Sequence, residues 1–544
     1  MIDPFDYCRS EFPALYGPAL PMEFNLADLW EKVADTIPEK QALADGSRRF
    51  TYAALDARAN ALAHVLERRG VKAGDHIGVY LYNCSEYIET MLAAFKLRAV
   101  PINVNYRYVE DELRYLFTDA DAVALVADVA FAPKISAIRY ELPLLHTVIT
   151  VGADGDYESL IASESSSRDF GPRSADDHYM LYTGGTTGMP KGVIWRHQDV
   201  FFGAMGGAGG GSTPIATPEE ISQRCVEGRT RVVPACPFMH GTAHWMALST
   251  LFVGGAVIID QNRNFNPAAL WRLIADEAAT FLVIVGDAFA RPLVEAIDAD
   301  VDLSSLQVLL SGGAILSPAI KEALVDVLPG VIIVDGYGAS ETGGQGQSVT
   351  VGGSAVPAST RFTVNGQTMV LDDDLNPAKV GVVGRLARRG HIPLGYYKDP
   401  EKTAATFPTD ANGDRWSVPG DHARLEEDGN ITLLGRGSMS INTGGEKVYP
   451  EEIESALKSH PTVFDAVVVG VPDERFGERV VAVVQARESL DLEPSALMNH
   501  VRLNAAAYKA PRSIIPVENI QRLPSGKPDY RWARTTAMNA LGLA

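Results

Sequence analysis

The stretch FTYAALDARANALAHVLERRGVKAGDHIGVYLYN, residues 50–83, contains the pattern that decides the fold. Thr51 can cap a helix, because its hydroxyl can accept a hydrogen bond from a free N–H of the first turn. Leu62 and Leu66 then share one helix face, and Gly70 can end the helix because glycine readily adopts the left-handed conformation. The apolar, alternating IGVYLY that follows predicts a strand, so the stretch reads as a helix and then a strand.

The same pair of elements recurs along the chain. SEYIETMLAAFKLRAVPINVN, beginning at residue 85, again predicts a helix and then a strand. Other β-branched runs end in a turn and usually precede a helical stretch: DAVALVAD, GAVIIDQ, ATFLVIVGD, LQVLLSGGA and GVIIVDGYG. Strands that alternate with helices predict an α/β fold whose parallel strands are covered by helices on both faces.

The pattern changes after GDHARLEEDGNITLLGRG, residues 420–437. Pro450 suits the first turn of a helix, and the two glutamates after it favour the positive end of the helix dipole. Strand-like DAVVVGVPD and ERVVAVVQA, helical PSALMNHVRLNAAA and strand-like SIIPVENI follow. Because 544 residues are too many for one core, we expect a large N-terminal domain of layered β-sheets flanked by helices, residues 1–436, and a small α+β C-terminal domain, residues 437–544.

Composition narrows the class of protein. The formal net charge of −20 argues against a nonspecific nucleic-acid binder, because such proteins rely on clustered lysine and arginine. The N-terminal MIDPFDYCRSEFPALYG has acids where a secretory signal has cations, and no apolar run is long enough to span a bilayer. The four cysteines form no CxxC pair, which indicates neither a zinc site nor a disulfide framework. We expect a cytoplasmic protein without integral membrane association.

LYTGGTTGMPKG, residues 181–192, predicts a loop that follows a strand. Its glycines permit backbone N–H groups to face a ligand, its threonines add hydroxyl donors, and Lys191 adds a positive charge, so a polyphosphate is the expected ligand. The alternative is an ordinary loop with a solvated lysine. The stretch also differs from the common P-loop, because Gly192 follows Lys191.

A second glycine-rich stretch, GAMGGAGGGSTP, spans residues 203–214. It lacks a lysine and a clear preceding strand, so we interpret it as a flexible surface loop rather than a second phosphate site. A loop near the mouth of a substrate site is the remaining alternative.

Two more segments, LLSGGA at 309–314 and DGYGASET at 335–342, follow apolar runs and are expected at the carboxyl ends of strands, where ligands bind in α/β sheets. Tyr337 offers a stacking face, and Glu341 offers a carboxylate for Mg²⁺. The alternatives are a tyrosine packed at a sheet edge and a glutamate in the first turn of a helix.

Three polar side chains of the later chain complete the set of candidates. Asp421 can accept hydrogen bonds from ribose hydroxyls and Arg436 can donate them, although an ion pair between the two would look the same in sequence. Lys527 follows a glycine in LPSGKPDYR, residues 523–531, where a solvent-exposed lysine is the alternative.

Together, YTGGTTGMPKG, DGYGASET, PGD, GR followed by INTGGEKVYPEEIE, and PSGK have the order and approximate spacing found in the adenylate-forming enzymes. That superfamily comprises acyl-CoA synthetases, luciferases and peptide-synthetase adenylation domains. The resemblance covers nearly the whole chain. PACPFMHGTAHW and VGDAFARPL look most like bacterial long-chain and bulky-acyl CoA ligases, including those that act on steroid side-chain acids.

The resemblance implies two half-reactions that use ATP, Mg²⁺ and coenzyme A. A carboxylate attacks the α-phosphate of ATP to give acyl-AMP and pyrophosphate, and the CoA thiol then displaces AMP. Because an anion must attack a polyanion, positioning and electrostatic stabilisation are expected to dominate catalysis. The resemblance also implies that the small domain is mobile and rotates between the half-reactions. The acidic hinge residue that the family usually has after GR is absent here.

The resemblance assigns roles to particular residues. The catalytic set is Lys191 for the β- and γ-phosphates, Ser340 for the α-phosphate, Glu341 for Mg²⁺ and Lys527 as the bridge between carboxylate and phosphate. The implied nucleotide and CoA contacts are Thr183, Gly184, Gly185, Thr186, Thr187, Gly188, Lys191, Gly312, Gly313, Ala314, Asp335, Gly336, Tyr337, Gly338, Ser340, Thr342, Asp421, Arg436, Gly444, Gly445 and Lys447. The implied acyl-pocket residues are Phe238, His240, Trp245, Gly286 and Phe289.

The expected partner is a hydrophobic carboxylic acid, fatty, steroidal or aryl-alkyl, because the implied pocket mixes large aromatic residues with glycine. Loading of a carrier-protein thiol is the alternative function, and a luciferase-type oxygenase or a nucleotide sensor is a more distant one. The residues leave the oligomeric state open, a homodimer being one possibility.

Overall fold

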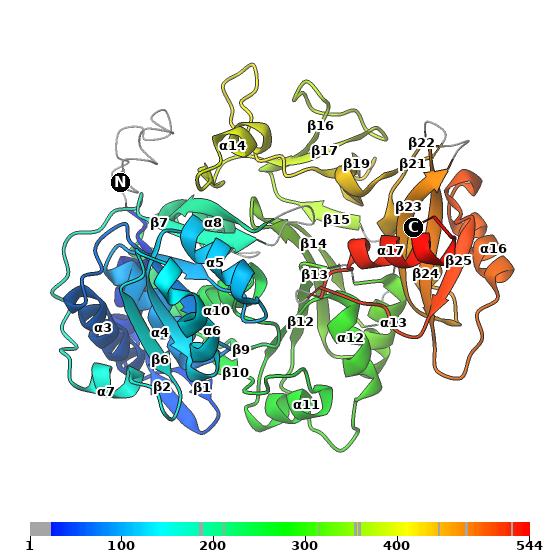
Figure 1. Cartoon of the computed structure of the whole chain (residues 1–544). Coiled ribbons are helices and arrows are strands. Elements are labelled where there is room, and N and C mark those ends of the chain that lie inside the picture. The colour runs from blue at the N-terminus through cyan, green and yellow to red at the C-terminus, as the bar shows by residue number, and fades with distance from the viewer. Residues whose placement is uncertain are drawn as a thin grey trace.

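The computed structural model describes residues 23–183, 189–209, 213–314, 316–352, 356, 361–443, 446–473, 477–523 and 526–543. Across these ranges the chain forms two sheets and their helices in a large lobe, followed by a third sheet in a small lobe (Figure 1). Among the described residues, no helix combines the length and apolar character needed to span a bilayer.

The seven-stranded sheet of the large lobe contains β3 (His76–Tyr80), the strand that ends the stretch 50–83. In spatial order, its strands are β18 (Gly395–Tyr396), β8 (Lys191–Arg196), β7 (His178–Thr183), β4 (Val100–Asn103), β3 (His76–Tyr80), β5 (Ala122–Asp128) and β6 (Thr147–Val151). Helices α5 (Glu110–Asp119) and α6 (Ala132–Ile138) cover one face, and α3 (Tyr52–Arg68) and α4 (Ser85–Lys96) cover the other. The predicted alternation of helices and strands is confirmed.

The local sequence explains these helix ends. Thr51 caps α3, its hydroxyl accepting a hydrogen bond from the N–H of Ala54 at 3.2 Å. Gly70 lies just beyond α3 with a φ of +91°, a conformation that L side chains rarely adopt. The predicted helix start and end are therefore confirmed, and β3 begins six residues later.

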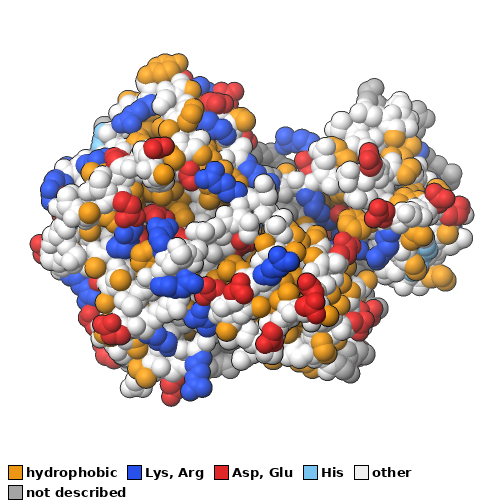
Figure 2. Space-filling model, turned by 90° about the horizontal axis from the view of Figure 1, so that it is seen from below, with side chains coloured by type: hydrophobic (Ala, Val, Ile, Leu, Met, Phe, Trp, Pro, Cys, Tyr) orange, Lys and Arg blue, Asp and Glu red, His pale blue; other side chains and the backbone are white. Residues whose placement is uncertain are grey.

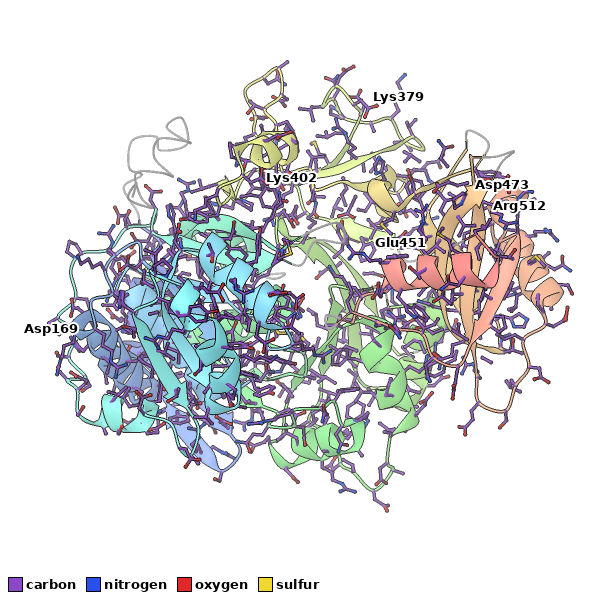
Figure 3. The ribbon with its side chains drawn as sticks, in the orientation of Figure 1. Asp169, Lys379, Lys402, Glu451, Asp473 and Arg512 are labelled. Carbon is purple, nitrogen blue, oxygen red and sulfur yellow. The ribbon has the colours of Figure 1, made fainter. Side chains whose placement is uncertain are left out.

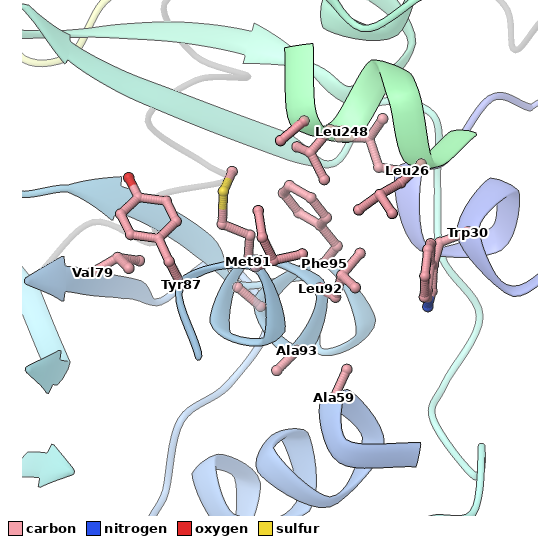
Figure 4. Close-up of a cluster of buried hydrophobic side chains, with 14 of the residues drawn as sticks. Leu26, Trp30, Ala59, Val79, Tyr87, Met91, Leu92, Ala93, Phe95 and Leu248 are labelled. Carbon is pink, nitrogen blue, oxygen red and sulfur yellow. The ribbon is translucent and has the colours of Figure 1, made fainter. Parts of the chain in front are cut away.

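Helix α4 is buried on all sides between the two sheets of the large lobe. Figure 4 shows Met91, Leu92 and Phe95 of α4 among side chains from α2 (Leu26–Thr36), α3, β3 and α10 (Gly241–Phe252). These apolar side chains are at most 2% exposed. A fully buried side chain of this size stabilises a fold by roughly 1.5–3 kcal/mol, so this layer fixes the two sheets against each other.

The larger sheet has a parallel half and an antiparallel half. In order, its thirteen described strands are β16 (Thr368–Leu371), β17 (Val383–Arg388), β19 (Asp421–Leu425), β20 (Ile431–Arg436), β15 (Arg361–Val364), β14 (Gly343–Thr350), β13 (Ile332–Ala339), β12 (Val308–Gly312), β11 (Phe281–Ile284), β9 (Arg231–Pro234), β10 (Ala256–Ile259), β1 (Gln41–Asp45) and β2 (Arg48–Thr51). Pairing is parallel from β13 to β1 and antiparallel from β14 to β16. The outer face of the parallel half packs against α11 (Pro267–Asp276), α12 (Gly286–Glu295) and α13 (Pro318–Val327).

Four shorter helices surround these sheets in the large lobe. They are α7 (Tyr157–Ala162), α8 (His197–Ala204), α9 (Glu220–Glu227) and α14 (Pro400–Thr406). Helix α8 follows β8 directly, which places the start of the second glycine-rich stretch at its end.

The small lobe is a five-stranded sheet with helices on both faces. Its described elements are β21 (Ile441–Thr443), β22 (Glu446–Val448), α15 (Pro450–Lys458), β23 (Val463–Asp473), β24 (Gly477–Ala486), α16 (Pro494–Asn504), β25 (Ser513–Val517) and α17 (Tyr530–Ala540). Alternate residues of β23 face opposite ways, so that Val468 packs with α15 and α16 whereas Val467 packs with α17. Every helix and strand predicted for this part of the chain is present.

Candidate active site

A cleft of about 2930 Å³ is lined by residues of both lobes. Its walls come from the β7–β8 hairpin, α10, β12 to β14, β19 and β20, and from α15 and the turn before α17. Figure 2 shows a recess between the large body and the smaller mass. Figure 3 labels Glu451 of α15 on the side of the small lobe that faces the large one, whereas Asp473 and Arg512 lie toward its outer edge.

The predicted adenine and ribose residues lie together in this cleft. Gly312 and Gly336 are register partners in the parallel strands β12 and β13. The Tyr337 hydroxyl donates a hydrogen bond to Asp421 Oδ2 at 2.7 Å, which joins two motifs that are 84 residues apart. Arg436 is the backbone register partner of Asp421, while its side chain lies outside the described part of the chain.

The DGYG motif lies at the carboxyl end of a strand, as expected. It forms the last part of β13, which continues to Ala339 and pairs antiparallel with β14, and the rest of DGYGASET forms the turn that follows. Its glycines permit close pairing, since a Cβ on Gly338 would lie 2.3 Å from the carbonyl oxygen of Gly343. Gly312, Gly313, Ala314, Asp335, Gly336, Tyr337, Gly338 and Ser340 all line the cleft.

Asp335 forms a buried ion pair below this surface. Its carboxylate lies 2.8 Å from the ammonium group of Lys321, and both side chains are almost inaccessible to solvent. Burial raises the pKa of Asp335 to about 6, although the charge of Lys321 opposes the shift.

The turn after β13 carries Glu341 at the wall of the cleft. Glu341 is 8% exposed, and its Oε1 accepts a hydrogen bond from the Tyr396 hydroxyl at 2.9 Å. Thr342 points the other way, because it is fully buried and its hydroxyl bonds the backbone of Ala339 and Gly343. We therefore withdraw Thr342 as a nucleotide contact.

Arg388 holds this turn and was missed in the sequence. Its Nη1 donates to the carbonyl of Thr342, to that of Gly344 at 2.8 Å and to that of Gly203 at 3.3 Å. Burial lowers the pKa of Arg388 to about 10, so the guanidinium remains charged at neutral pH. Ser417, which forms an isolated bridge with Arg388, donates to the Glu341 carbonyl at 2.6 Å and so fixes the same turn from a second segment. An arginine inside RLARRG carries no sequence signal for this role.

Lys191 begins β8 as the register partner of Thr183, the last residue of β7. Gly184, Gly185, Thr186, Thr187 and Gly188, which join the two strands, lie outside the described residues. The Lys191 ammonium donates to Asp399 Oδ2. Burial alone would raise the pKa of Asp399, but the hydrogen bonds from Lys191 and the Lys402 N–H, together with the charges of both lysines, outweigh it and the pKa lies below its usual value. A phosphate that binds Lys191 must therefore compete with Asp399.

His240 and Lys527 line the same cleft from the two lobes. His240 precedes α10, and its Nε2 is buried without a hydrogen-bond partner among the described residues. Burial, followed by the positive charge of Lys527, lowers the pKa of His240 to about 4. Gly526 approaches Val285 of the large lobe, since a Cβ there would lie 3.4 Å from Val285 Cγ1. This contact brings Lys527 to the cleft that the nucleotide motifs line.

Three of the five predicted acyl-pocket residues do not line the cleft, whereas His240 and Trp245 do. Phe238 is 1% exposed and packs 5.4 Å from the ring of Tyr87, and Phe289 packs 4.6 Å from that of Phe265. Gly286 starts α12, where its N–H donates to the Ser311 hydroxyl. We therefore withdraw Phe238, Gly286 and Phe289, because motif position alone does not say which side chains face inward.

The second glycine-rich stretch supplies part of the cleft wall instead. Gly206, Ala208, Met246 and Ser249 line the cleft beside Trp245. Gly206 has a φ of +95°, and a Cβ on it would lie 2.7 Å from the Ser249 hydroxyl, so the backbone approaches α10 closely. The described part of this stretch is packed, so the interpretation as a flexible surface loop is wrong there. The sequence interpretation did not consider that glycine in this stretch allows the backbone to approach a helix closely.

The Trp245 indole is fixed in the wall by hydrogen bonds. Its Nε1 donates to the Tyr179 hydroxyl at 2.9 Å, and that hydroxyl also bonds His244 Nε2. His244 Nδ1 lies 2.6 Å from the carbonyl of Phe238. A chain of buried hydrogen bonds of this kind holds one rotamer of the indole against the ligand space.

The donor set at Glu341 fits Mg²⁺. No group of three or more metal-binding side chains occurs in the described ranges. Mg²⁺ is usually held by one or two carboxylates together with substrate phosphates and water, so one buried carboxylate at the wall of a nucleotide cleft is sufficient. For CoA, Gly444 and Gly445 lie outside the described residues, as does the side chain of Lys447.

Models of known protein families match segments of both lobes. A family model described as an AMP-binding enzyme matches residues 30–397, and one described as the C-terminal domain of AMP-binding enzymes matches residues 452–527. The chain belongs to the AMP-binding enzyme family.

Named relatives of this AMP-binding enzyme extend over almost all of it. A 3-oxocholest-4-en-26-oate--CoA ligase from Rhodococcus rhodochrous is 47% identical over 94% of this chain and 96% of the relative. A medium/long-chain-fatty-acid--CoA/3-oxocholest-4-en-26-oate--CoA ligase from Mycolicibacterium smegmatis is 46% identical over the same shares. The crystal structure of ATP-bound MatB from Rhodopseudomonas palustris superposes with a TM-score of 0.81 at 27% identity, covering 94% of this chain and 99% of MatB.

Proposed function

We propose that this AMP-binding enzyme is an ATP-dependent acid:CoA ligase that converts a hydrophobic acid first to an acyl-AMP and then to an acyl-CoA thioester. The expected substrates are steroid side-chain acids and medium- or long-chain fatty acids, as named for relatives that are 46–47% identical. The observation that carries the proposal is one cleft in which Tyr337, Asp421 and Glu341 face Lys527 and an apolar wall.

In the first half-reaction, a carboxylate oxygen of the acid attacks the α-phosphorus of ATP, and the bond to the pyrophosphate oxygen breaks. Tyr337 and Asp421 hold the adenosine, Lys191 leaves Asp399 to bind the outer phosphates, and Ser340 contacts the α-phosphate. Mg²⁺, held by Glu341 when bound, supplies positive charge to the phosphate oxygens. Lys527 neutralises the carboxylate and the α-phosphate as they meet, which stabilises a transition state that is otherwise opposed by charge repulsion.

In the second half-reaction, the sulfur of CoA attacks the acyl carbon, and AMP leaves. The small lobe is proposed to turn so that Lys527 withdraws and Lys447, with the adjoining Gly444 and Gly445, approaches CoA. We place the domain boundary near Arg436, because β20 ends there and β21 begins the third sheet. A few residues able to change φ and ψ are enough for such a hinge.

The acyl wall supports a bulky substrate. Gly206, Ala208 and Ser249 are small and line the cleft beside the fixed Trp245, which leaves room for a broad apolar group next to a rigid aromatic face. A site of this kind discriminates single methylenes by only about 1–3 kcal/mol. We therefore expect a range of accepted acids rather than one chain length.

The test is incubation with ATP, Mg²⁺, CoA and a panel of acids, with mass spectrometry of the CoA products. The panel contains 3-oxocholest-4-en-26-oate, a medium-chain and a long-chain fatty acid, an aryl-alkyl acid and acetate. We expect thioesters of the steroid and fatty acids and little from acetate. Absence of thioester from every acid would contradict the proposal, and transfer to a carrier-protein thiol with no transfer to CoA would support the alternative function.

A further inference from the structure

A buried set of charged side chains runs from α12 of the large lobe to the turn that carries Lys527. Its members are Asp287 on α12, Lys458 on α15, Asp465 on β23 and Arg522 before the turn. The Lys458 ammonium lies 3.4 Å from Asp465 Oδ1 and 4.0 Å from Asp287 Oδ2, so it stands between the two lobes. We name these four residues the interlobe charge network.

Arg522 uses its guanidinium in two directions. Its Nη2 donates to Asp465 Oδ1 and Oδ2 at 2.8 and 2.6 Å, and its Nε donates to Oδ2 at 3.0 Å. Its Nη1 donates to the carbonyl of Gly526 at 2.9 Å, which is the peptide group directly before Lys527. A planar fork with several donors fixes direction as well as distance, which a lysine cannot do.

The backbone of the Lys527 turn is closed by two further hydrogen bonds. The N–H of Leu523 donates to the carbonyl of Lys527, and the N–H of Gly526 donates to that of Leu523, both at 2.8 Å. Arg522 and Pro528 form an isolated antiparallel bridge across the base of the turn. Movement of Arg522 therefore moves the segment from which the Lys527 side chain starts.

The interlobe charge network is largely removed from solvent. The side chains of Asp287, Lys458, Asp465 and Arg522 are 5%, 4%, 12% and 16% exposed. Buried charges are costly unless they are paired, and two acids with two bases balance here. Although burial alone would raise the pKa of Asp465, Lys458 and Arg522 hold it below its usual value, so the carboxylate stays ionised.

The large-lobe end of the network is anchored. Asp287 Oδ1 accepts a hydrogen bond from the N–H of Ser317 at 2.8 Å, while Oδ2 has no hydrogen-bond donor among the described residues and faces Lys458. One turn further along α12, the Arg291 guanidinium lies 4.5 Å from the centre of the Phe464 ring, next to Asp465. Lys458 and Phe464 of the small lobe thus both contact α12.

We propose that Arg522 and Asp465 are positioning residues that fix the direction of Lys527, and that Lys458 transmits this alignment from Asp287 of the large lobe. Lys527 is held at the cleft that His240 also lines only while the small lobe contacts α12. This inference rests on the proposed function, because it assumes that Lys527 acts in acyl-AMP formation.

The experiment measures each half-reaction separately in the full-length protein. Pyrophosphate release without CoA reports acyl-AMP formation, and thioester release from supplied acyl-AMP and CoA reports the second step. For Arg522→Met we expect the first step to fall on the order of 10- to 100-fold, the range expected for a misplacement of about 1 Å, and the second step to stay within about twofold. Arg522→Lys should retain part of the first step. Arg502→Met, an exposed arginine of α16 in the same lobe, is the matched control.

Lys527→Ala is measured in parallel to separate the two ideas. If Lys527→Ala impairs the first step but Arg522→Met does not, or if Arg522→Met impairs both steps equally, the positioning role is overturned while the ligase proposal stands. If Lys527→Ala leaves acyl-AMP formation intact, the proposed role of Lys527 fails and its positioning residues have no function to serve.

The contact between the lobes has its own test. Asp287→Asn and Lys458→Met are combined in a double-mutant cycle that reads acyl-AMP formation. We expect each single change to lower the rate several-fold and the double change to cost little more than either one, because both remove the same contact. Additive losses would overturn the role of this pair. Asp465→Asn supplies a second route to the same result if Lys458→Met does not fold.

Discussion

Glu341 and Lys527 reach the same cleft through supports of different kinds. The Glu341 turn is held within the large lobe, by Arg388 and Ser417 on backbone carbonyls and by Tyr396 on the carboxylate. The Lys527 turn is held within the small lobe by Arg522, and its alignment to the cleft depends on α12 of the other lobe. The proposed metal ligand is thus supported by its own lobe alone, whereas the proposed bridging cation is placed by contact between the lobes.

The sharpest way to break this comparison is to remove the bridging cation. Lys527→Ala should lower the rate of acyl-AMP formation on the order of 10²–10³-fold, because it deletes charge stabilisation at the reacting atoms. Thioester formation from supplied acyl-AMP should fall much less, as measured by stopped reactions with CoA. Equal losses in the two steps would show that Lys527 is not specific to the first.

Replacement of Arg388, which supports the Glu341 turn, should lower both the stability of the fold and the rate of acyl-AMP formation. Arg388→Met leaves the carbonyls of Thr342 and Gly344 without their donor, at a cost of about 3 kcal/mol in the free energy of unfolding, and it should lower acyl-AMP formation about 10²-fold through displacement of Glu341. Urea unfolding and pyrophosphate release measure the two effects. Arg389→Met is the control, since this neighbour pairs with Asp414 at the surface. If added Mg²⁺ does not change the Arg388→Met defect, Glu341 does not act through the metal.

The acyl wall can be narrowed without touching either support. Gly206→Val places a side chain against Ser249 and should lower kcat/KM for the steroid acid about 10- to 100-fold relative to a short acid. Gly413→Val controls for backbone strain, because Gly413 has a similar φ of +87° but faces open space. Equal losses for short and bulky acids would place Gly206 outside the acyl site.

Acid is expected to lower the free energy of unfolding of the large lobe. Burial lowers the pKa of both His178 and His197 to about 3, with nearby positive charge adding to the shift. Because the unfolded chain binds these protons near pH 6.5, stability is full above that value and falls as pH drops from about 6.5 to 3, by up to about 1.4 kcal/mol per unit for each histidine. Urea unfolding followed by tryptophan fluorescence reports this lobe, since Trp532 is the only tryptophan of the six beyond residue 416. His197→Gln should flatten the dependence, and an unchanged slope would contradict the assignment.

The smallest expected effect concerns the phosphate-binding lysine. Asp399→Asn removes the partially exposed partner of Lys191 and should lower the KM for ATP about twofold to fivefold, in line with a partly exposed ion pair worth at most about 1 kcal/mol. Steady-state kinetics with ATP varied measures this. Asp414→Asn, which disrupts a surface pair elsewhere, should leave this KM unchanged. A raised KM in Asp399→Asn would mean that Asp399 helps the nucleotide to bind.

Much of this fold could be predicted from periodicity and capping. Thr51, Gly70 and Pro450 mark helix ends through local hydrogen bonding and backbone preference, and these act within a few residues. The DGYG segment could be placed at the carboxyl end of a strand but not in a hairpin, because an apolar run ending in glycine is compatible both with a strand that stops and with a hairpin that continues. Only its pairing with β14 distinguishes the two.

The residues of the candidate site could also be predicted only in part from the sequence. Tyr337, Asp421, Glu341 and Lys527 could be named because their motifs are local, and the structure brings them to one cleft. Phe238 and Phe289 were misjudged because their direction depends on contacts with Tyr87 and Phe265, which belong to other elements of the chain. Arg388 and Arg522 were missed for a related reason, since an arginine that binds peptide carbonyls looks like any surface arginine.

His240 bears on the order in which ligands enter. With a pKa of about 4, this imidazole is neutral in the cell, so it offers an incoming acid no electrostatic attraction. We therefore expect the carboxylate of an incoming acid to depend on cations that line the cleft, of which Arg107 belongs to the large lobe and Lys527 to the small one. An acid that binds before the lobes meet should accordingly be held by fewer positive charges than one that binds afterwards.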